Sequence, residues 1–146
     1  AARPPGHTPN HRASGVVERG RPVAVCTGGS VWDGTVGRTD LIAESATGPL
    51  TRAQFRSVRR LADELPDGVA VHPTHGFGSF CSSTSTRGTH DSPIAQERVS
   101  NLALTVDDEA TFVARLLAGL TAYPRYYAHI AGINSLGPAP PDLFPP

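Results

Sequence analysis

An amphipathic helix pattern that leads directly into a short strand pattern constrains the fold of this chain more than any other feature. From Thr51 to Leu65 the apolar residues recur at helical spacing, with Thr51 as the expected N-cap, and four arginines occupy a solvated face. Pro66-Asp67-Gly68 ends the helix pattern, and the apolar run at residues 69–72 favours a strand. Strands that alternate with helices in this way are typical of α/β folds.

The first third of the chain extends this pattern with two further strands. Residues 13–19 and 21–27 are apolar-rich runs on either side of Arg19-Gly20, which predicts a β-hairpin. Cys26 lies inside the second run, so we expect it to be buried as a small apolar residue. Residues 31–48 contain several glycines and are predicted to form a loop.

The last third of the chain contains two helix starts and a proline-rich end. Ser92-Pro93 is typical of a helix N-terminus, and the helix is expected to run to about Ser100. The capping-box character of residues 105–108 predicts the start of another helix. Residues 1–137 are therefore assigned to one domain, and residues 138–146 to a proline-rich tail or linker stump.

Length, charge and cysteine use narrow the class of protein. The 146 residues suffice for one domain, and the formal net charge of zero predicts no nucleic-acid partner. No apolar run reaches membrane-spanning length, and the two cysteines form no CxxC pattern, so a cytoplasmic protein without a membrane partner is expected. The chain has no methionine and begins beside its first motif, which leads us to expect a fragment.

Two histidines lie in proline-led turns. His7 is in Pro5-Gly6-His7-Thr8-Pro9, and His75 is in Pro73-Thr74-His75-Gly76, immediately after the strand pattern of residues 69–72. Neutral imidazole is the commonest protein metal ligand, and loops at strand ends commonly carry such ligands. His7 and His75 are therefore the candidate metal ligands.

These turns belong to a series of motifs spread over most of the chain. In order, the motifs are Pro5-Gly6-His7-Thr8-Pro9 with His11, Thr27-Gly28-Gly29-Ser30 with Val36-Gly37-Arg38-Thr39-Asp40-Leu41, Pro73-Thr74-His75-Gly76, the segment from Ile94 that contains Glu97, Arg98 and Asn101, and residues 131–138. Together they resemble the C-terminal half of a metallo-β-lactamase-fold domain. The resemblance is to the branch that contains persulfide dioxygenases, glyoxalase II-type thioesterases and actinobacterial fusions with rhodanese domains.

The resemblance implies an α/β fold, the αββα sandwich, with only its C-terminal half in this chain. It also implies iron or zinc, with His7 and His75 as ligands in dinuclear sites and His7 alone of the two in mononuclear iron sites. The family's motif aspartate corresponds to Gly29, which has no side chain, and Asp33 is the nearest substitute in sequence. The family's HxHxDH motif is not in the chain, so we expect that the chain alone binds no metal.

The resemblance also implies a substrate-binding role for two arginines. Arg38 and Arg98 correspond to positions that meet the carboxylates of glutathione-like substrates, a task that suits the planar guanidinium fork. An equally weighted alternative for Arg38 is that it pairs with Asp40 and braces the loop. The other histidines, among them His11, His72 and His129, are expected to have structural or solvated roles.

Three functions follow from these expectations. The first is a persulfide dioxygenase-like protein of sulfur metabolism that acts on glutathione persulfide and is impaired by the loss of the motif aspartate. The second is a zinc-dependent thioester or lactone hydrolase of the glyoxalase II type. The third is a degenerate, non-catalytic domain kept for packing or partner contact. The expected partners are a small thiol-derived substrate such as a glutathione conjugate, and a second copy of the chain or a rhodanese domain.

Overall fold

The computed structural model describes residues 1–74, 81, 92–122 and 124–137. Within these residues the sheet has four strands in the order β1-β2-β3-β4. The strands are β1 (Ser14–Glu18), β2 (Arg21–Gly28), β3 (Ala70–Pro73) and β4 (Ser92–Pro93). Only the β2–β3 pair is parallel, and the two outer pairs are antiparallel. The predicted hairpin is confirmed: Arg19 and Gly20, with φ of 48° and 79°, form its tight turn.

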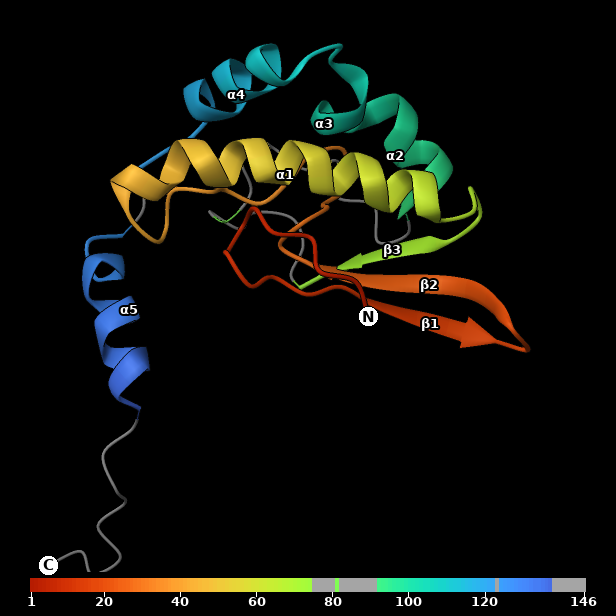
Figure 1. Cartoon of the computed structure of the whole chain (residues 1–146), viewed down its shortest axis with the longest axis horizontal. Coiled ribbons are helices and arrows are strands. Elements are labelled where there is room, and N and C mark those ends of the chain that lie inside the picture. Colours follow the sequence, from red (N-terminus) through yellow and green to blue (C-terminus); the bar gives the residue numbers. More distant parts are fainter. Residues whose placement is uncertain (75–80, 82–91, 123, 138–146) are drawn as a thin grey trace, which may run out of the picture.

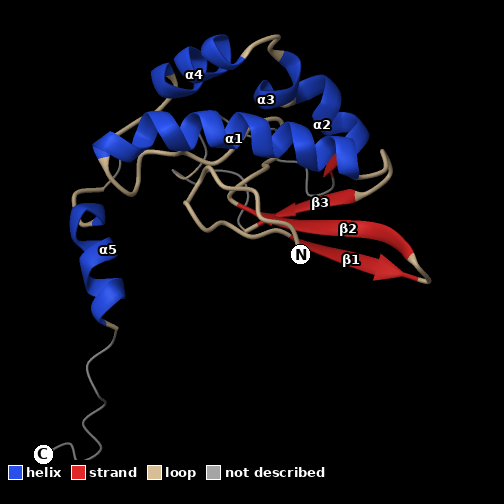
Figure 2. Ribbon diagram, in the orientation of Figure 1, coloured by secondary structure: helices blue, strands red, loops and turns tan. Residues whose placement is uncertain are grey.

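The helices are α1 (Glu44–Glu64), α2 (Ile94–Ser100), α3 (Leu102–Thr105), α4 (Glu109–Ala118) and α5 (Tyr127–Leu136). Four of the five helices in the described residues, α1 to α4, lie on one side of this sheet (Figures 1 and 2). The long helix α1 crosses the sheet, α3 and α4 pack against α1, and α5 projects away from the other elements. The predicted α/β class is therefore confirmed.

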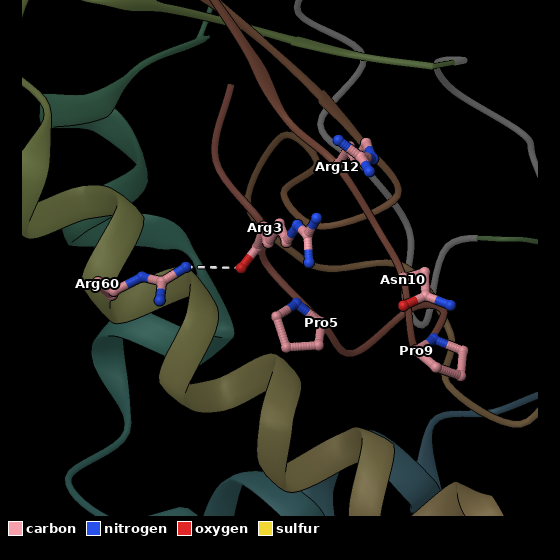
Figure 3. A pocket seen from close by; sticks show the side chains of 6 residues that line it. All are labelled: Arg3, Pro5, Pro9, Asn10, Arg12 and Arg60. Atoms are coloured by element: carbon pink, nitrogen blue, oxygen red, sulfur yellow. Dashed lines mark hydrogen bonds between the residues drawn. The ribbon is translucent and has the colours of Figure 1, made fainter.

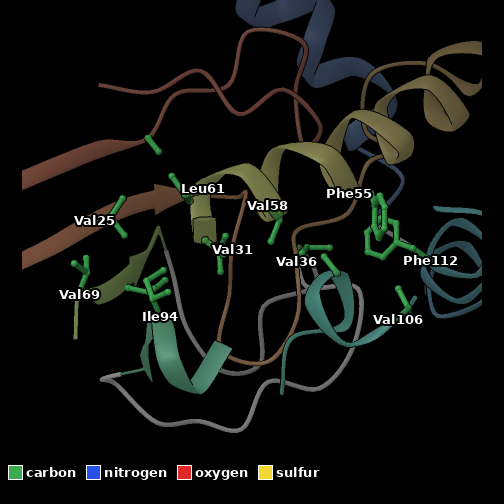
Figure 4. Close-up of a cluster of buried hydrophobic side chains, with 14 of the residues drawn as sticks. Val25, Val31, Val36, Phe55, Val58, Leu61, Val69, Ile94, Val106 and Phe112 are labelled. Carbon is green, nitrogen blue, oxygen red and sulfur yellow. The ribbon is translucent and has the colours of Figure 1, made fainter. Parts of the chain in front are cut away.

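The core lies between the sheet and α1 and continues to α4 (Figure 4). Val25 and Val71 of the sheet are 2% exposed, and Val58 of α1 is 1% exposed. Farther along α1, Phe55 meets Phe112 of α4 with ring centroids 5.2 Å apart. The apolar face predicted for α1 is confirmed, because helical spacing places these residues on one side of the helix.

Two helix starts differ from the sequence prediction. Helix α1 begins at Glu44 rather than at Thr51, which is fully buried and donates through Oγ1 to the carbonyl of Thr47. Pro49 can lie inside the helix because the carbonyl it leaves unpaired belongs to Ser45, an exposed residue that water can reach. Helix α4 begins after Asp108, the N-cap that accepts from the Thr111 amide, a bond that lowers the pKa of Asp108.

The solvated arginine face predicted for α1 is only partly correct. Arg52 and Arg56 are exposed as expected. Arg59 is half-buried: its guanidinium lies 4.4 Å from the Phe55 ring centroid and donates to the carbonyls of Ala103 and Val106. Arginine can take this role because its long stem packs on apolar groups while its head forms hydrogen bonds.

The sheet face opposite α1 has no covering element among the described residues (Figure 2). Cys26, predicted to be buried, is exposed because it alternates with the inward-facing Val25 and Thr27. Its partner across the parallel pair, His72, is exposed as well. Val16 of β1 is 48% exposed. An uncovered sheet face with apolar residues is the arrangement expected of half a sandwich.

A fully buried carboxylate joins α2 to the loop before α1. The carboxylate of Glu97 accepts from the amide of Gly34, from Ser92 Oγ and from Asn101 Nδ2. Asn101 Nδ2 also donates to the carbonyl of Thr35 at 2.6 Å. Burial is the main cause that raises the pKa of Glu97 above its ordinary value, although these hydrogen bonds oppose the shift.

We expect Glu97 to make the stability of the protein depend on pH. Because the folded protein holds the Glu97 proton more tightly than the unfolded chain does, its contribution is complete below the ordinary glutamate pKa. That contribution is lost as pH rises through the raised pKa. Denaturant unfolding of the protein and of Glu97→Gln over a pH series measures this effect, because the variant should lack this fall. Parallel pH profiles for the two proteins would contradict the prediction.

No helix in the described residues is long and apolar enough to cross a membrane.

Candidate functional site

The loop that carries His7, defined here as residues 3–11, lies along α1 and is held by three side chains of that helix. The three bonds join Gln54 Oε1 to the His7 amide at 2.7 Å, Ser57 Oγ to the Pro5 carbonyl at 2.8 Å and Arg60 Nη2 to the Arg3 carbonyl at 2.6 Å. Every third residue of the helix thus meets every second residue of the extended loop. This regular spacing fixes the loop, and with it the position of His7.

Gln54 connects the His7 loop to the turn at residues 27–30. Its side chain is fully buried, and Nε2 donates to the carbonyl of Ser30 at 2.6 Å and of Gly29 at 3.3 Å. Gly6 packs so closely on Gln54 that an added Cβ would lie 1.9 Å from Oε1. Gln54 was not predicted from the sequence as a residue of this site. A signal was present, since Gln54 lies four residues from both Leu50 and Val58 and is a polar residue within the apolar stripe.

The imidazole of His7 has a defined orientation. Its Nδ1 lies 2.7 Å from the carbonyl oxygen of Arg38. Because a carbonyl oxygen can only accept, Nδ1 must carry the hydrogen, and the lone pair of the neutral ring is then on Nε2. A histidine that donates one ring N–H to a carbonyl is oriented as metal-binding histidines commonly are.

The ring of His7 occupies the space that a side chain at position 29 would need. A Cβ added to Gly29 would lie 2.3 Å from Cδ2 and 2.5 Å from Cγ of His7. A Cβ added to Gly37 would lie 2.9 Å from His7 Nδ1 and 2.3 Å from the Gly29 carbonyl oxygen. Glycine at both positions therefore lets the imidazole approach the backbone closely.

His11 lies next to His7 and contacts the same turn. The two rings meet edge to face, with centroids 5.6 Å apart. His11 Nε2 lies 3.0 Å from the Thr27 carbonyl oxygen and 3.1 Å from the Gly29 amide nitrogen. The first contact requires a hydrogen on Nε2 and the second requires its lone pair, so only one of these hydrogen bonds exists at a time.

Near His7, the chain can supply one metal ligand, which is the His7 imidazole. Position 29 cannot supply the bridging carboxylate, because glycine has no side chain. Among residues 1–74, 81, 92–122 and 124–137, no group of three or more His, Cys, Asp or Glu could hold a metal ion. His75 lies outside the described residues, so its role as a ligand stays a prediction. Asp33 is 8% exposed and belongs to no such group within the described chain.

Arg38 is almost fully buried, and its guanidinium pairs with Asp40. Nε and Nη2 reach the two carboxylate oxygens at 2.7 and 2.8 Å, and Nη2 also donates to the Thr121 carbonyl. Arg38 is 1% exposed. This geometry corresponds to the bracing role considered above, and substrate binding by Arg38 stays a prediction.

Arg98 lies away from His7. It donates to the Ala62 carbonyl near the C-terminal end of α1 and to Asp67 at 3.0 Å. His7 meets α1 at Gln54, eight residues earlier, which corresponds to about 12 Å along a helix. The structure therefore brings His7, Arg38 and Gly29 together but does not bring Arg98 to them. Substrate binding by Arg98 also stays a prediction.

Comparisons with known proteins identify the fold. No protein-family model and no curated protein sequence matches the chain. A crystal structure of a metallo-beta-lactamase from Staphylococcus aureus subsp. aureus COL is similar, with a TM-score of 0.78 and 27% sequence identity. The match covers 90% of this chain and 38% of that chain, so this chain spans less than half the length of that protein. The chain therefore has the metallo-β-lactamase fold and corresponds to part of such a domain.

Proposed function

We propose that this chain is the C-terminal portion of a metallo-β-lactamase-fold hydrolase in which His7 is one ligand of a single zinc ion. The proposed substrate is a thioester or lactone of a small thiol-derived molecule. The remaining ligands would come from the HxHxDH segment of a longer protein. That segment would belong to a second sheet packed on the uncovered face of β1–β3.

The observation that carries this proposal is the bond from His7 Nδ1 to the Arg38 carbonyl. It selects the ring nitrogen that can bind a metal and prevents the imidazole from turning over. Gln54 adds a second restraint through the His7 amide. A ligand restrained at both its ring and its backbone is suited to bind a metal without prior rearrangement.

Position 29 favours hydrolysis over oxygen chemistry. A mononuclear iron dioxygenase of this kind needs two histidines and a carboxylate, and the carboxylate position is Gly29. In a hydrolase of this type, the family's aspartate only bridges two metals, so the ion on His7 can retain its other ligands. Zinc in such a site supplies Lewis-acid polarisation of the substrate carbonyl. The residues of this chain orient the imidazole of His7 through the Arg38 carbonyl and Gln54.

A degenerate, non-catalytic domain is the second candidate function. The pairing of Arg38 with Asp40 supports it, because a guanidinium whose Nε and Nη2 already donate has fewer donors to offer a substrate carboxylate. The His7 ring against Gly29 supports it as well, since it fills the space of a catalytic carboxylate. In this alternative the uncovered sheet face would serve a partner, and a second copy or a rhodanese domain stays a prediction.

A zinc titration followed by imidazole NMR tests the proposal on a protein that joins the HxHxDH segment to this chain, because the chain alone is expected to bind no metal. At a pH above the ordinary imidazole pKa, zinc should shift the ring resonances of His7 through Nε2. His7→Ala should weaken zinc binding at least about tenfold, equivalent to about 1.4 kcal/mol. The matched control is His129→Ala, an exposed histidine of α5, which should leave zinc affinity unchanged.

Two results would contradict the zinc proposal. One is zinc binding that is equally strong in His7→Ala and in the unchanged protein that contains the HxHxDH segment. The other is a titration in which the His7 resonances do not respond while those of other histidines do. Either result would favour the non-catalytic alternative, because the oriented imidazole would then serve only the packing of the loop.

A further inference from the structure

A hollow lined by three arginines lies between the His7 loop and α1. Its volume is about 350 Å³. The lining residues are Arg3, Pro5, Pro9, Asn10, Arg12 and Arg60 (Figure 3). It is formed by backbone and side chains other than the His7 imidazole, and it does not depend on the metal proposed above.

The charge in this hollow is poorly compensated. Arg3 and Arg12 form no ion pair with any acidic residue of the described chain. Arg60 has one acidic neighbour, Glu64, with Nε and Oε1 3.7 Å apart and both side chains more than half exposed. Such an exposed pair contributes little. Three guanidinium groups thus repel one another around a space that holds no carboxylate.

The walls of the hollow are held in place. Pro5 and Pro9 have fixed φ angles, which limits movement of the loop. Ser57 donates to the Pro5 carbonyl, and Arg60 donates to the Arg3 carbonyl. In Figure 3 the Arg3 side chain extends toward Arg12 and Asn10, while Arg60 lies on the opposite side. Donors therefore surround the space from both the loop and the helix.

We propose that this hollow binds a phosphate group of a small molecule. A guanidinium binds phosphate oxygens through two parallel N–H donors, and several arginines together suit a group with two negative charges. The Asn10 amide adds a neutral donor at the rim. A volume of about 350 Å³ admits a phosphate monoester or a pyrophosphate but not a folded partner.

Occupation of the hollow would also fix the His7 loop more firmly on α1. An anion that bridges Arg60 to Arg3 and Arg12 ties the helix to both ends of the loop. The Arg60–Arg3 hydrogen bond already joins these elements at one point. The phosphate site would therefore act on the segment that carries His7.

Titration with pyrophosphate, followed through the amide NMR signals of the chain, tests this proposal. The largest shifts should fall on the amides of Arg3, Asn10 and Arg12. The double variant Arg3→Ala/Arg12→Ala should raise the Kd at least tenfold, and added salt should weaken binding to the unchanged chain. The matched control is Arg52→Ala, which should leave the Kd unchanged. Arg52 is an exposed arginine of α1, the helix that carries Arg60, and it does not line the hollow.

Succinate, which carries two carboxylates, separates phosphate recognition from general anion binding and should bind at least tenfold more weakly than pyrophosphate. Equal affinity for succinate and pyrophosphate would overturn the assignment to phosphate. An equal Kd for the double variant and the Arg52→Ala control would overturn the site itself. Zinc binding by His7 is measured separately, so failure here is distinguishable from failure of the zinc proposal.

Discussion

Gln54→Ala is expected to lower the free energy of unfolding by about 3 kcal/mol. Gln54 is fully buried and bonds three backbone groups, which are the His7 amide and the carbonyls of Gly29 and Ser30. Alanine would leave these groups without partners and would open a cavity beside Gly6. Urea unfolding measures the change in stability, and hydrogen exchange of the His7 amide measures the local effect.

Gln96→Ala is the matched control for this prediction. Gln96 is half-buried on α2, and the same chemical change there should alter stability by no more than about 0.5 kcal/mol. A loss of less than about 1 kcal/mol for Gln54→Ala, with unchanged protection of the His7 amide, would show that Gln54 does not hold the loop.

Gly29→Ala is expected to lower the free energy of unfolding by about 2 kcal/mol through overpacking. The added Cβ would lie 2.3 to 2.7 Å from three atoms of the His7 ring, so the ring must move and strain its bond to the Arg38 carbonyl. The control is Gly15→Ala, because a Cβ at Gly15 meets nothing within 4 Å. That variant should be close to neutral. A similar loss of stability in both variants would contradict steric conflict with His7.

Local patterns predicted the elements whose residues carry a regular period. The hairpin around Arg19-Gly20 and the apolar face of α1 at Phe55, Val58 and Leu61 follow from alternation and helical spacing. The start of α1 was predicted wrongly because Gly48 and Pro49 are poor helix formers. In the structure, Ser45 in the first turn is exposed, so water can reach the carbonyl that Pro49 leaves unpaired, and the buried face of the helix begins at Leu50.

Long-range contacts decided what the sequence analysis missed. Cys26 has the apolar neighbours of a buried strand residue, yet it faces the side of the sheet that no described element covers. The position of Arg59 in the helical pattern predicts a solvated side chain. In the structure α3 packs against α1 there, and Arg59 donates a hydrogen bond to the carbonyl of Ala103 in α3. No local sequence pattern predicts the exposure of Cys26 or the partial burial of Arg59, because each depends on which elements pack against that side of the strand or helix.

The candidate site was predictable only in part, because some of its features are local in sequence and others depend on contacts between distant residues. The turn motif identified His7, and the absent side chain at Gly29 was read directly from the sequence. The contact between the His7 ring and Gly29 joins residues 22 positions apart and required the structure. Arg38 and Asp40, two residues apart, were recognised as a possible pair, whereas the distance of Arg98 from this pair depends on the path of α1.

A double-mutant cycle between positions 29 and 7 tests whether the imidazole of His7 is fixed in the space that a side chain at position 29 would occupy. In the His7→Ala background the space is vacated, so Gly29→Ala should cost less than about 0.5 kcal/mol instead of about 2 kcal/mol. A Gly29→Ala loss that is the same in both backgrounds would place the ring elsewhere and contradict the proposed site.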